Sequence, residues 1–252
     1  SASFSVDGQH MLLPFNNPLT GPPVPPSFDS STLWSREIGL RMDWLDKTLR
    51  TDVTLYDLDW RKAQFPENND NIVVDTTYIA NVGRVRSRGV EGSIAWLTPL
   101  EGLSLNLSGA YSRALTASEY VAKDGTVVPA GTDAPNAPRW QTATTLAYNT
   151  SIGQWLSGAA LVHTWSTRAF TTVTHDNQIY GFGSFGLNLN VSRPDWRFAP
   201  ALALGVTNLT DVRGVVGRSS SNGTSGLTGG DTTSYIYTRP LAVSLRLSAE
   251  FN

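Results

Sequence analysis

Hydrophobic and polar residues alternate with a period of two along most of the chain. In the segment 241–251, apolar residues take every second position: Leu241, Val243, Leu245, Leu247, Ala249 and Phe251. The positions between them are small, polar or charged: Ala242, Ser244, Arg246, Ser248 and Glu250. An extended segment of this length covers about 33 Å at about 3.3 Å per residue, enough to cross a bilayer when tilted. The pattern predicts an amphipathic β-strand, either in a membrane barrel or in a soluble sandwich.

The same alternation predicts nine strands and no helix. They lie near residues 37–44, 48–62, 90–96, 103–111, 140–149, 155–170, 180–192, 196–210 and 241–251. Two of them change phase. In 48–62 the apolar positions move from Leu55 to Tyr56, and in 180–192 they move from Phe182 to Phe185. A β-bulge, or an exit of the strand from lipid into water, explains such a change.

The connections between these strands alternate in length. Short connections are expected at 45–47, 98–102, 150–154 and 193–195, and long irregular ones at 9–33, 65–77, 117–138, 171–179 and 211–233. Outer-membrane barrels have short periplasmic turns and long outer loops. A soluble meander has no physical reason to keep its short turns at one end, so the alternation favours a membrane barrel.

Aromatic residues gather at both ends of the predicted strands. Four tryptophans lie beside the short turns: Trp44, Trp96, Trp155 and Trp196. Nine aromatic residues lie toward the long loops: Trp60, Tyr78, Tyr111, Trp140, Trp165, Phe170, Tyr180, Tyr235 and Tyr237. Amphipathic rings favour the headgroup level at each face of a bilayer, so two girdles are predicted.

Composition narrows the class of protein. Charged residues make up only 16% of the 252 residues, and the net charge is −2, which does not indicate nucleic-acid binding. The zero cysteine count excludes disulfides and thiolate sites. No apolar run is long enough for a membrane-spanning helix, whereas alternating strands remain compatible with a membrane. The opening residues lack a signal peptide, so we expect a chain that is already processed or truncated.

Five segments in order resemble the carboxy-terminal half of the β-barrel of TonB-dependent outer-membrane receptors. They are Ser35–Arg41 with Thr51–Asp59, Asn81–Glu91 with its Asn-x-Gly and Gly-Val-Glu elements, Ala137–Trp140, Gly205–Asp211 with its Asn-Leu-Thr-Asp element, and Arg239–Phe251. One departure is that Asn252 follows Phe251, whereas the family usually ends on an aromatic residue.

The resemblance implies an all-β fold, an antiparallel up-and-down transmembrane β-barrel. Such transporters have about 22 strands, so the nine predicted here are the last nine of a larger barrel. Residues 1–33 are then an outer loop with the end of a preceding strand, and residues 34–252 are the carboxy-terminal part of the barrel, without the plug domain. Leu245, Leu247 and Phe251 are then the assembly signal read by the barrel-assembly machinery.

By the same resemblance, the protein imports a scarce, bulky nutrient through the bacterial outer membrane. A ferric siderophore is the expected ligand. The expected partners of the protein are outer-membrane lipid and, through a plug not present here, the TonB energy-coupling protein. The resemblance implies no cofactor for the barrel. A passive porin or adhesin with a complete small barrel, which would have an even strand count, is the alternative.

Charged residues divide into two candidate groups. Arg84, Arg86 and Arg88 share one face, and because arginine on a lipid face costs about 2–4 kcal/mol at the midplane, they point into the lumen or lie above the membrane. These arginines either pair with lumen carboxylates such as Glu37, Asp43 or Glu91 or with acids of the plug, or steer an anionic ligand. The predicted lumen charges are Glu37, Arg41, Asp43, Glu91, Arg246 and Glu250. Further ligand-facing candidates, which are equally interpretable as interface anchors, are Trp165, His175, Tyr235 and Tyr237.

Catalytic and metal sites find little support in the sequence. The histidines are His10, His163 and His175, and only His175-Asp176 offers a base beside an acid for a hydrolase at the barrel rim. The glycine pattern 181–186 matches a dinucleotide loop but lies within a strand pattern with no helix after it. We expect no enzyme activity and no metal site.

Overall fold

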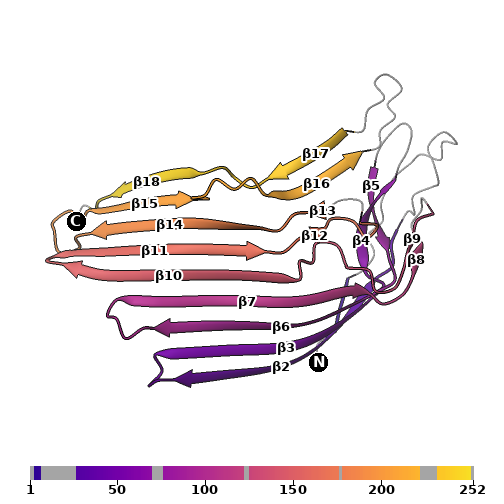
Figure 1. The fold of residues 1–252 in the computed structure, drawn as a ribbon, viewed down its shortest axis with the longest axis horizontal. Coiled ribbons are helices and arrows are strands. Elements are labelled where there is room, and N and C mark those ends of the chain that lie inside the picture. The colour runs from indigo at the N-terminus through magenta and orange to yellow at the C-terminus, as the bar shows by residue number, and fades with distance from the viewer. Residues whose placement is uncertain are drawn as a thin grey trace.

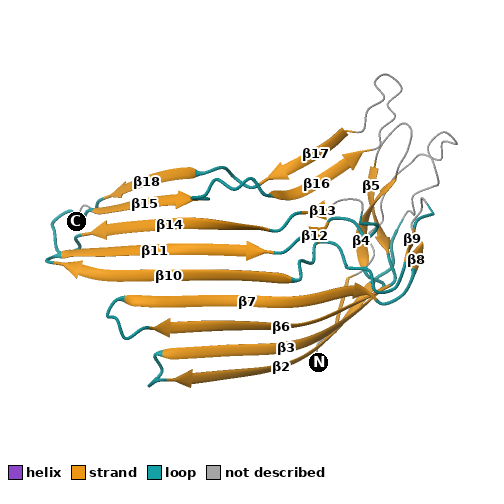
Figure 2. Ribbon diagram, in the orientation of Figure 1, coloured by secondary structure: helices purple, strands orange, loops and turns teal. Residues whose placement is uncertain are grey.

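The computed structural model describes residues 3–6, 27–69, 76–121, 125–175, 178–221 and 232–250. Strands and the turns between them make up these parts of the chain, which contain no helix (Figure 2). Within the described ranges, accordingly, no helix has the length and apolar character needed to cross a membrane. The all-β fold predicted from the alternation is therefore correct.

Ten strands form one large antiparallel sheet in the order β1-β2-β3-β6-β7-β10-β11-β14-β15-β18 (Figure 1). They are β1 (Ser3–Val6), β2 (Ser31–Trp44), β3 (Leu49–Arg61), β6 (Arg84–Leu97), β7 (Leu103–Thr116), β10 (Trp140–Ile152), β11 (Trp155–Ser166), β14 (Phe182–Ser192), β15 (Ala201–Thr207) and β18 (Ala242–Ser248). Nine of them correspond to the predicted strands, and the short β1 pairs with the start of β2. Neighbours in the sheet follow one another up and down along the chain.

Four smaller hairpins occupy connections that were expected to be irregular. They are β4 (Gln64–Asn69) with β5 (Thr76–Asn81), β8 (Tyr120–Val121) with β9 (Val127–Val128), β12 (Ala169–Phe170) with β13 (Gln178–Ile179), and β16 (Val215–Ser221) with β17 (Thr232–Tyr237). All four lie at one end of the large sheet, opposite its short turns (Figure 1). The segregation of long and short connections is thus confirmed, although the long ones contain strand structure. The expected loop 9–33 falls mostly outside the described residues.

The two faces of the sheet differ in polarity. One row of cross-strand partners stays apolar over nine strands: Trp44, Leu49, Trp96, Leu105, Leu146, Leu161, Leu187, Val206 and Val243. On the opposite face, one row reads Arg41, Asp52, Ser93, Ser108, Ala143, Thr164 and Ser184. We call these the apolar face and the polar face.

Nothing in the described part of the chain covers the apolar face. Over the apolar band the strands of the large sheet pack against their neighbours in the sheet, so the protein has a single layer there. Side chains on this face are correspondingly exposed, for example Ile38 at 71% and Leu247 at 77%. A continuous apolar surface of this kind is far larger than a soluble monomer exposes, which excludes the soluble sandwich.

Neither predicted phase change involves a bulge in the large sheet. β2, β3 and β6 pair in continuous register from Leu49 to Arg61. On the face that carries Val53 and Leu55, the next alternate residues are Asp57 and Asp59. The strand therefore leaves the apolar band for a polar environment, the second explanation offered by the sequence. Likewise, Phe182 pairs with Ser166 on the polar face and Phe185 with His163 on the apolar face, again in continuous register.

The turn before β15 is longer than the alternation suggested. β14 ends at Ser192 and β15 begins at Ala201, so the predicted connection 193–195 extends to 200. Within this turn the Arg193 guanidinium lies 5.7 Å from the ring centroid of Trp155 and 5.0 Å from that of Trp196. The two indoles themselves meet edge to face at 6.3 Å. Trp196 thus belongs to the turn and packs at the end of the sheet with short connections.

A small core lies at the other end, where the hairpins join the sheet. Ala63, Val82, Val85 and Ala134 are buried together, and Trp60 and Phe65 pack against them. The rings of Trp60 and Phe65 meet edge to face at 5.3 Å. This cluster stabilises the hairpin end of β3 and β6, where the sheet has left the apolar band.

Candidate ligand-binding face and the charges at the hairpin end

The polar face carries the candidate binding surface. A hollow of about 630 Å³ lies over β3, β6, β7, β10 and β11, and its lining includes Asp52, Glu91, Ser108, Gln141 and Phe182. Hydroxyl, amide and carboxylate groups together can donate to and accept from a polar ligand. The size of the hollow is in the range of small-molecule sites.

Five of the predicted lumen charges share this polar face. Arg41 Nε donates to Asp52 Oδ2 at 2.8 Å, and beside this pair Arg50 Nε donates to Asp43 Oδ1 at 2.7 Å. Each pair joins directly opposed residues of β2 and β3. The crossed pairs balance the charge of this part of the wall, so they contribute polarity without a strong net field.

The other predicted lumen charges are placed as follows. Glu37 accepts a hydrogen bond of 2.6 Å from Ser35 Oγ, and Glu91 lines the hollow. Arg246 lies on the polar face of β18, opposite Ala203. Glu250 follows β18 at the short-turn end, where its backbone N–H donates to the Phe198 carbonyl at 2.9 Å. Their role in ligand passage stays a prediction.

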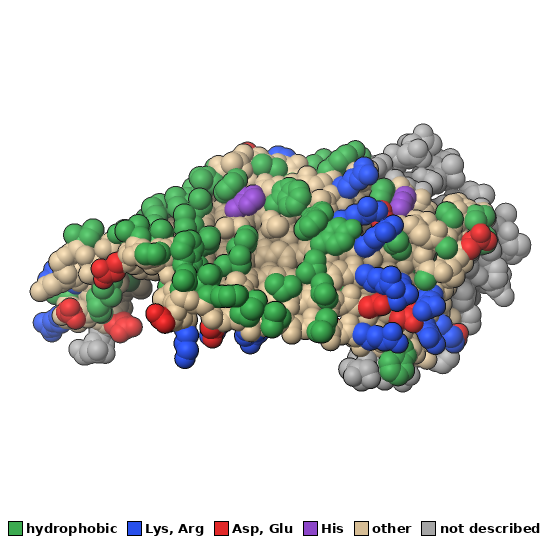
Figure 3. Space-filling model, turned by 60° about the horizontal axis from the view of Figure 1, so that its bottom comes forward, with side chains coloured by type: hydrophobic (Ala, Val, Ile, Leu, Met, Phe, Trp, Pro, Cys, Tyr) green, Lys and Arg blue, Asp and Glu red, His purple; other side chains and the backbone are tan. Residues whose placement is uncertain are grey.

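The arginine ladder does not point over the polar face. Arg84, Arg86 and Arg88 have the same strand parity as Val90 and Ile94, so they continue the apolar face beyond the apolar band. Figure 3 shows the corresponding group of basic and acidic side chains between the apolar side chains and the loop end. Of the two positions that the sequence left open, this placement favours the one above the membrane over the lumen.

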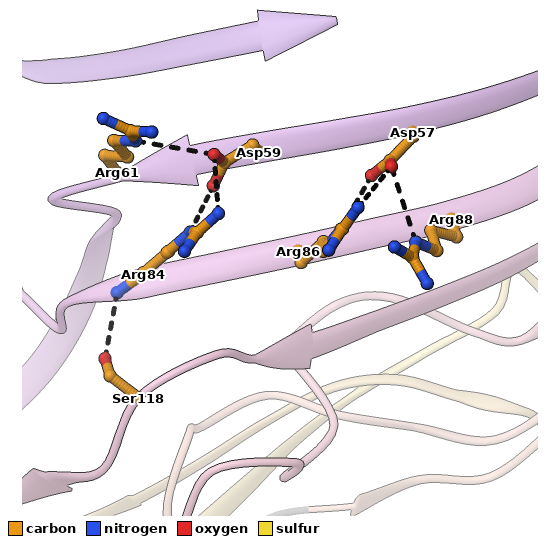
Figure 4. Close-up of polar contacts among 7 residues, drawn as sticks. All are labelled: Asp57, Asp59, Arg61, Arg84, Arg86, Arg88 and Ser118. Atoms are coloured by element: carbon orange, nitrogen blue, oxygen red, sulfur yellow. Dashed lines mark hydrogen bonds and ion pairs between the residues drawn. The ribbon is translucent and has the colours of Figure 1, made fainter. Parts of the chain in front are cut away.

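These arginines pair with aspartates of β3, not with the acids named from the sequence. Arg84 binds Asp59 in a two-point contact, Arg86 Nε donates to Asp57 Oδ1 at 2.9 Å, and Arg88 Nε lies 3.5 Å from Asp57 Oδ2 (Figure 4). The expected partners Glu37, Asp43 and Glu91 are wrong because they belong to the opposite face. Asp57 and Asp59 lie on the same face of β3 as Leu55, at the next alternate positions. The phase change in β3 was therefore the signal that could have identified them.

The four remaining ligand-facing candidates are scattered. Trp165 opposes Thr142 on the apolar face, the position expected for an interface anchor. The His175 ring stacks on Phe170 with centroids 3.7 Å apart, and its Nε2 lies 2.8 Å from the Asp133 carbonyl oxygen. Tyr235 and Tyr237 lie near each other on β17, with ring centroids 6.0 Å apart. The structure does not bring these four together, and ligand contact stays a prediction for each.

Two asparagines that were not among the predicted site residues hold the loop end together. Asn81 Nδ2 donates to the carbonyls of Asp29 and Lys62, at 3.1 and 2.9 Å, and its Oδ1 accepts from the Asp29 N–H at 2.8 Å. Two residues later, Gly83 adopts a φ of 87°, which favours glycine. The Asn-x-Gly element is therefore explained as a junction of three segments.

Asn208 has the same role beside β18. Its Nδ2 donates to the carbonyls of Val212 and Arg239, both at 2.9 Å, and its Oδ1 accepts from the Val212 N–H at 3.0 Å. Nearby, Asp211 accepts from the Leu241 N–H at 2.8 Å, and this hydrogen bond lowers the pKa of the carboxyl, with Arg213 adding to the effect. The Asn-Leu-Thr-Asp element thus fastens the loops on both sides of the β16–β17 hairpin.

Metal and histidine chemistry finds no assembled site in the described residues. These residues contain no group of three or more histidine, aspartate or glutamate side chains that could hold a metal ion. The His163 ring contacts that of Phe185 on the apolar face in a tilted arrangement, with centroids 4.3 Å apart. His10 and Asp176 lie outside the described residues. The structure therefore does not describe the His175–Asp176 pair suggested for a rim hydrolase. The His175 ring instead contacts Phe170 and the Asp133 carbonyl.

The predicted assembly signal is placed only in part. Leu245 and Leu247 lie on the apolar face of β18, opposite Leu204 and Leu202. Phe251 lies outside the described residues. Recognition by the assembly machinery stays a prediction.

A single-layer antiparallel sheet with a continuous apolar face, a polar opposite face, short turns at one end and hairpins at the other defines an outer-membrane β-barrel wall. Comparison with family models identifies which barrel it is. Residues 4–209 match the model described as TonB dependent receptor-like, beta-barrel, and the chain belongs to this family of outer-membrane proteins. Its location is the bacterial outer membrane, where the apolar face meets lipid and the polar face lines the interior.

Solved receptors share the fold. The ferric yersiniabactin uptake receptor FyuA from Yersinia pestis matches with a TM-score of 0.72 at 12% identity, over 100% of this chain and 34% of that one. BauA, the ferric preacinetobactin receptor from Acinetobacter baumannii, gives 0.63 at 14% identity, over 97% and 32%. The ferric-catecholate import receptor Fiu from E. coli K12 gives 0.55 at 21%, over 88% and 28%. The chain spans about a third of the length of these receptors. No curated protein sequence matches it.

Proposed function

We propose that the protein takes part in energy-coupled import of a scarce, bulky nutrient across the outer membrane, with a ferric siderophore as its ligand. The observation that carries this proposal is the family match over residues 4–209, together with a wall whose polar face is hollowed. Three of the structures that share the fold carry names of ferric-chelate receptors. In this proposal residues 34–252 form the carboxy-terminal part of the barrel.

The chemistry of the polar face is consistent with reversible binding rather than catalysis. Asp52, one of the two carboxylates in the lining of the hollow, is paired with Arg41, and hydroxyl and amide groups lie around it. Such a lining can exchange hydrogen bonds with a passing polar ligand without holding it tightly. The family is one of receptors and transporters, and we infer that the chain performs no covalent chemistry.

The proposal includes partners on both sides of the membrane. Lipid surrounds the apolar face, the assembly machinery recognises β18, and the TonB protein supplies energy through a plug. The passive porin alternative requires a sheet that closes on itself, whereas β1 and β18 are the unpaired edges of the sheet in the described residues. We therefore favour the energy-coupled receptor.

Growth on defined iron sources tests this function. The gene is deleted in the host, and growth under iron limitation is measured on ferric hydroxamate, ferric catecholate and ferric citrate in turn. We expect loss of growth on one of these chelates, its recovery on complementation, and the same loss in a strain that lacks TonB. Unchanged growth of the deletion strain on all three would overturn the ferric-chelate proposal.

A further inference from the structure

Six arginines form a belt on the apolar face at the hairpin end. This arginine belt consists of Arg36, Arg61, Arg84, Arg86, Arg88 and Arg113, and two aspartates, Asp57 and Asp59, lie within it. One row of the belt crosses four strands in direct register, as Arg36, Asp57, Arg88 and Arg113. Every member of the belt lies at alternate positions with the apolar residues of its strand, and therefore on the apolar face of the sheet.

The belt lies at the level of lipid headgroups. The next row on the same face, two residues farther along each strand, is Ile38, Leu55, Val90, Tyr111 and Trp140. Two residues correspond to about 6.6 Å, at about 3.3 Å per residue. Tyr111 and Trp140 contact each other with ring centroids 4.7 Å apart, which suits an interfacial girdle. The belt therefore begins directly above the hydrocarbon boundary.

The belt carries more positive charge than its own acids neutralise. Six arginines face two aspartates, an excess of four positive charges. Asp59 is shared by Arg84 and Arg61, and Asp57 by Arg86 and Arg88 (Figure 4). Arg36 and Arg113 make no ion pair within the described part of the chain. Arg88 is 61% exposed, so its remaining donors are accessible to an external anion.

The order of charges along the belt also favours a counterion. Arg88 and Arg113 are directly opposed on neighbouring strands, and like charges in that position destabilise a sheet. An anion between them removes the repulsion. Guanidinium groups bind phosphate by two parallel hydrogen bonds, and this geometry is specific to arginine.

We propose that the arginine belt binds the phosphate groups of anionic lipids in the outer leaflet. The belt faces outward, on the wall that meets lipid, whereas a soluble anion on its way through the barrel meets the opposite face. A phosphate anchored by acyl chains is held beside the belt by the apolar rows below it. Lipid is thus favoured over a soluble phosphate by position as well as by charge.

Lipid binding to the protein purified from outer membranes tests the proposal. Bound lipids are counted by native mass spectrometry after exchange into nanodiscs that contain either phosphatidic acid or phosphatidylcholine as the added lipid. The test variant is R88Q/R113Q, because Arg113 has no ion pair in the described residues and Asp57 keeps Arg86 as its partner. The matched control is R246Q, which removes one arginine from the polar face.

We expect the wild-type protein to retain phosphatidic acid and R88Q/R113Q to bind it at least about tenfold more weakly, because the loss of a single charge-assisted hydrogen bond already weakens binding by about that factor. R246Q should bind like the wild type, and high salt should weaken binding. Equal retention of phosphatidic acid by R88Q/R113Q and the wild type would overturn the proposal. Retention of phosphatidylcholine by the wild type at the level of phosphatidic acid would also overturn it. So would saturation of the arginine belt by inorganic phosphate alone, without lipid.

Loss of folding in the double variant is checked separately. Folded outer-membrane barrels migrate differently from unfolded ones on unheated gels, so each variant is assayed before lipid exchange. If R88Q/R113Q does not fold, the single variant R113Q replaces it. Retention of phosphatidic acid by folded R113Q at the wild-type level would then count against the belt.

Discussion

At the scale of single residues, Asn208 shows how one side chain fixes the path of the chain outside the membrane. Only 7% of Asn208 is exposed, and its φ of 52° lies in the left-handed region that asparagine tolerates better than most residues. Its amide satisfies two carbonyls and one N–H of the loop backbone. Both the side chain and the backbone conformation therefore contribute to this junction.

Replacing Asn208 by alanine should destabilise the hairpin end by about 1–3 kcal/mol, because buried backbone groups lose their partners. N208G separates the two contributions, since glycine accepts the positive φ at no steric cost but supplies no amide. We expect N208G to be only slightly more stable than N208A in urea unfolding. If N208G matched the wild type, backbone conformation and not hydrogen bonding would explain this asparagine.

At the scale of strands, alternation predicted the elements of the large sheet, and the loops beyond it were harder to predict. The long strands, such as β10 and β11, were recognisable because one face must be apolar in lipid and the other polar. The hairpins β4–β5, β8–β9, β12–β13 and β16–β17 lie in water, where no such constraint applies. The end of the apolar band on β3 was visible in the sequence as a phase change. The continuous register of the sheet was needed to show that the strand leaves the apolar band and has no bulge.

For the candidate site, the sequence predicted the face on which charged residues lie but not their partners. Alternate positions along a strand share a face, so the sequence correctly placed Arg41, Asp43 and Glu91 together on the polar face. The partners of Arg84, Arg86 and Arg88 were missed because the phase change after Leu55 was not connected with the arginines of the next strand in the sheet. Contacts such as that of His175 with the Asp133 carbonyl join separate loops and have no signal in a single sequence.

The two faces of a single strand can be tested by moving a charge across it. Leu146 lies in the middle of β10 on the apolar face, and its neighbour Thr145 lies on the polar face. We expect L146R to lower the unfolding free energy by about 2–4 kcal/mol, the cost of arginine at the bilayer midplane. T145R should cost much less, because the polar face is hydrated. Unfolding in urea from lipid vesicles measures both, and equal losses would contradict the assignment of the faces.

At the scale of the whole molecule, the wall does two things with opposite faces of one sheet. The apolar rows and the arginine belt match the layers of the membrane, from hydrocarbon to headgroup. The polar face carries the crossed ion pairs of β2 and β3 and the hollow lined by Glu91 and Gln141. Since a strand has only two faces, changes to the lipid side and to the transport side can be made at neighbouring residues.

Filling the hollow should therefore affect import without affecting insertion. Ser93 lines the hollow, and the adjacent Ile94 lies on the apolar face. We expect S93W to reduce uptake of the chelate that supports growth several-fold, because an indole occupies space on the path of a bulky ligand. I94W adds the same ring on the lipid side, where apolar bulk is tolerated, and should leave uptake unchanged. Uptake of radiolabelled iron, with the amount of protein in outer membranes as the reference, distinguishes them; equal uptake by S93W and I94W would show that the hollow is not on the path.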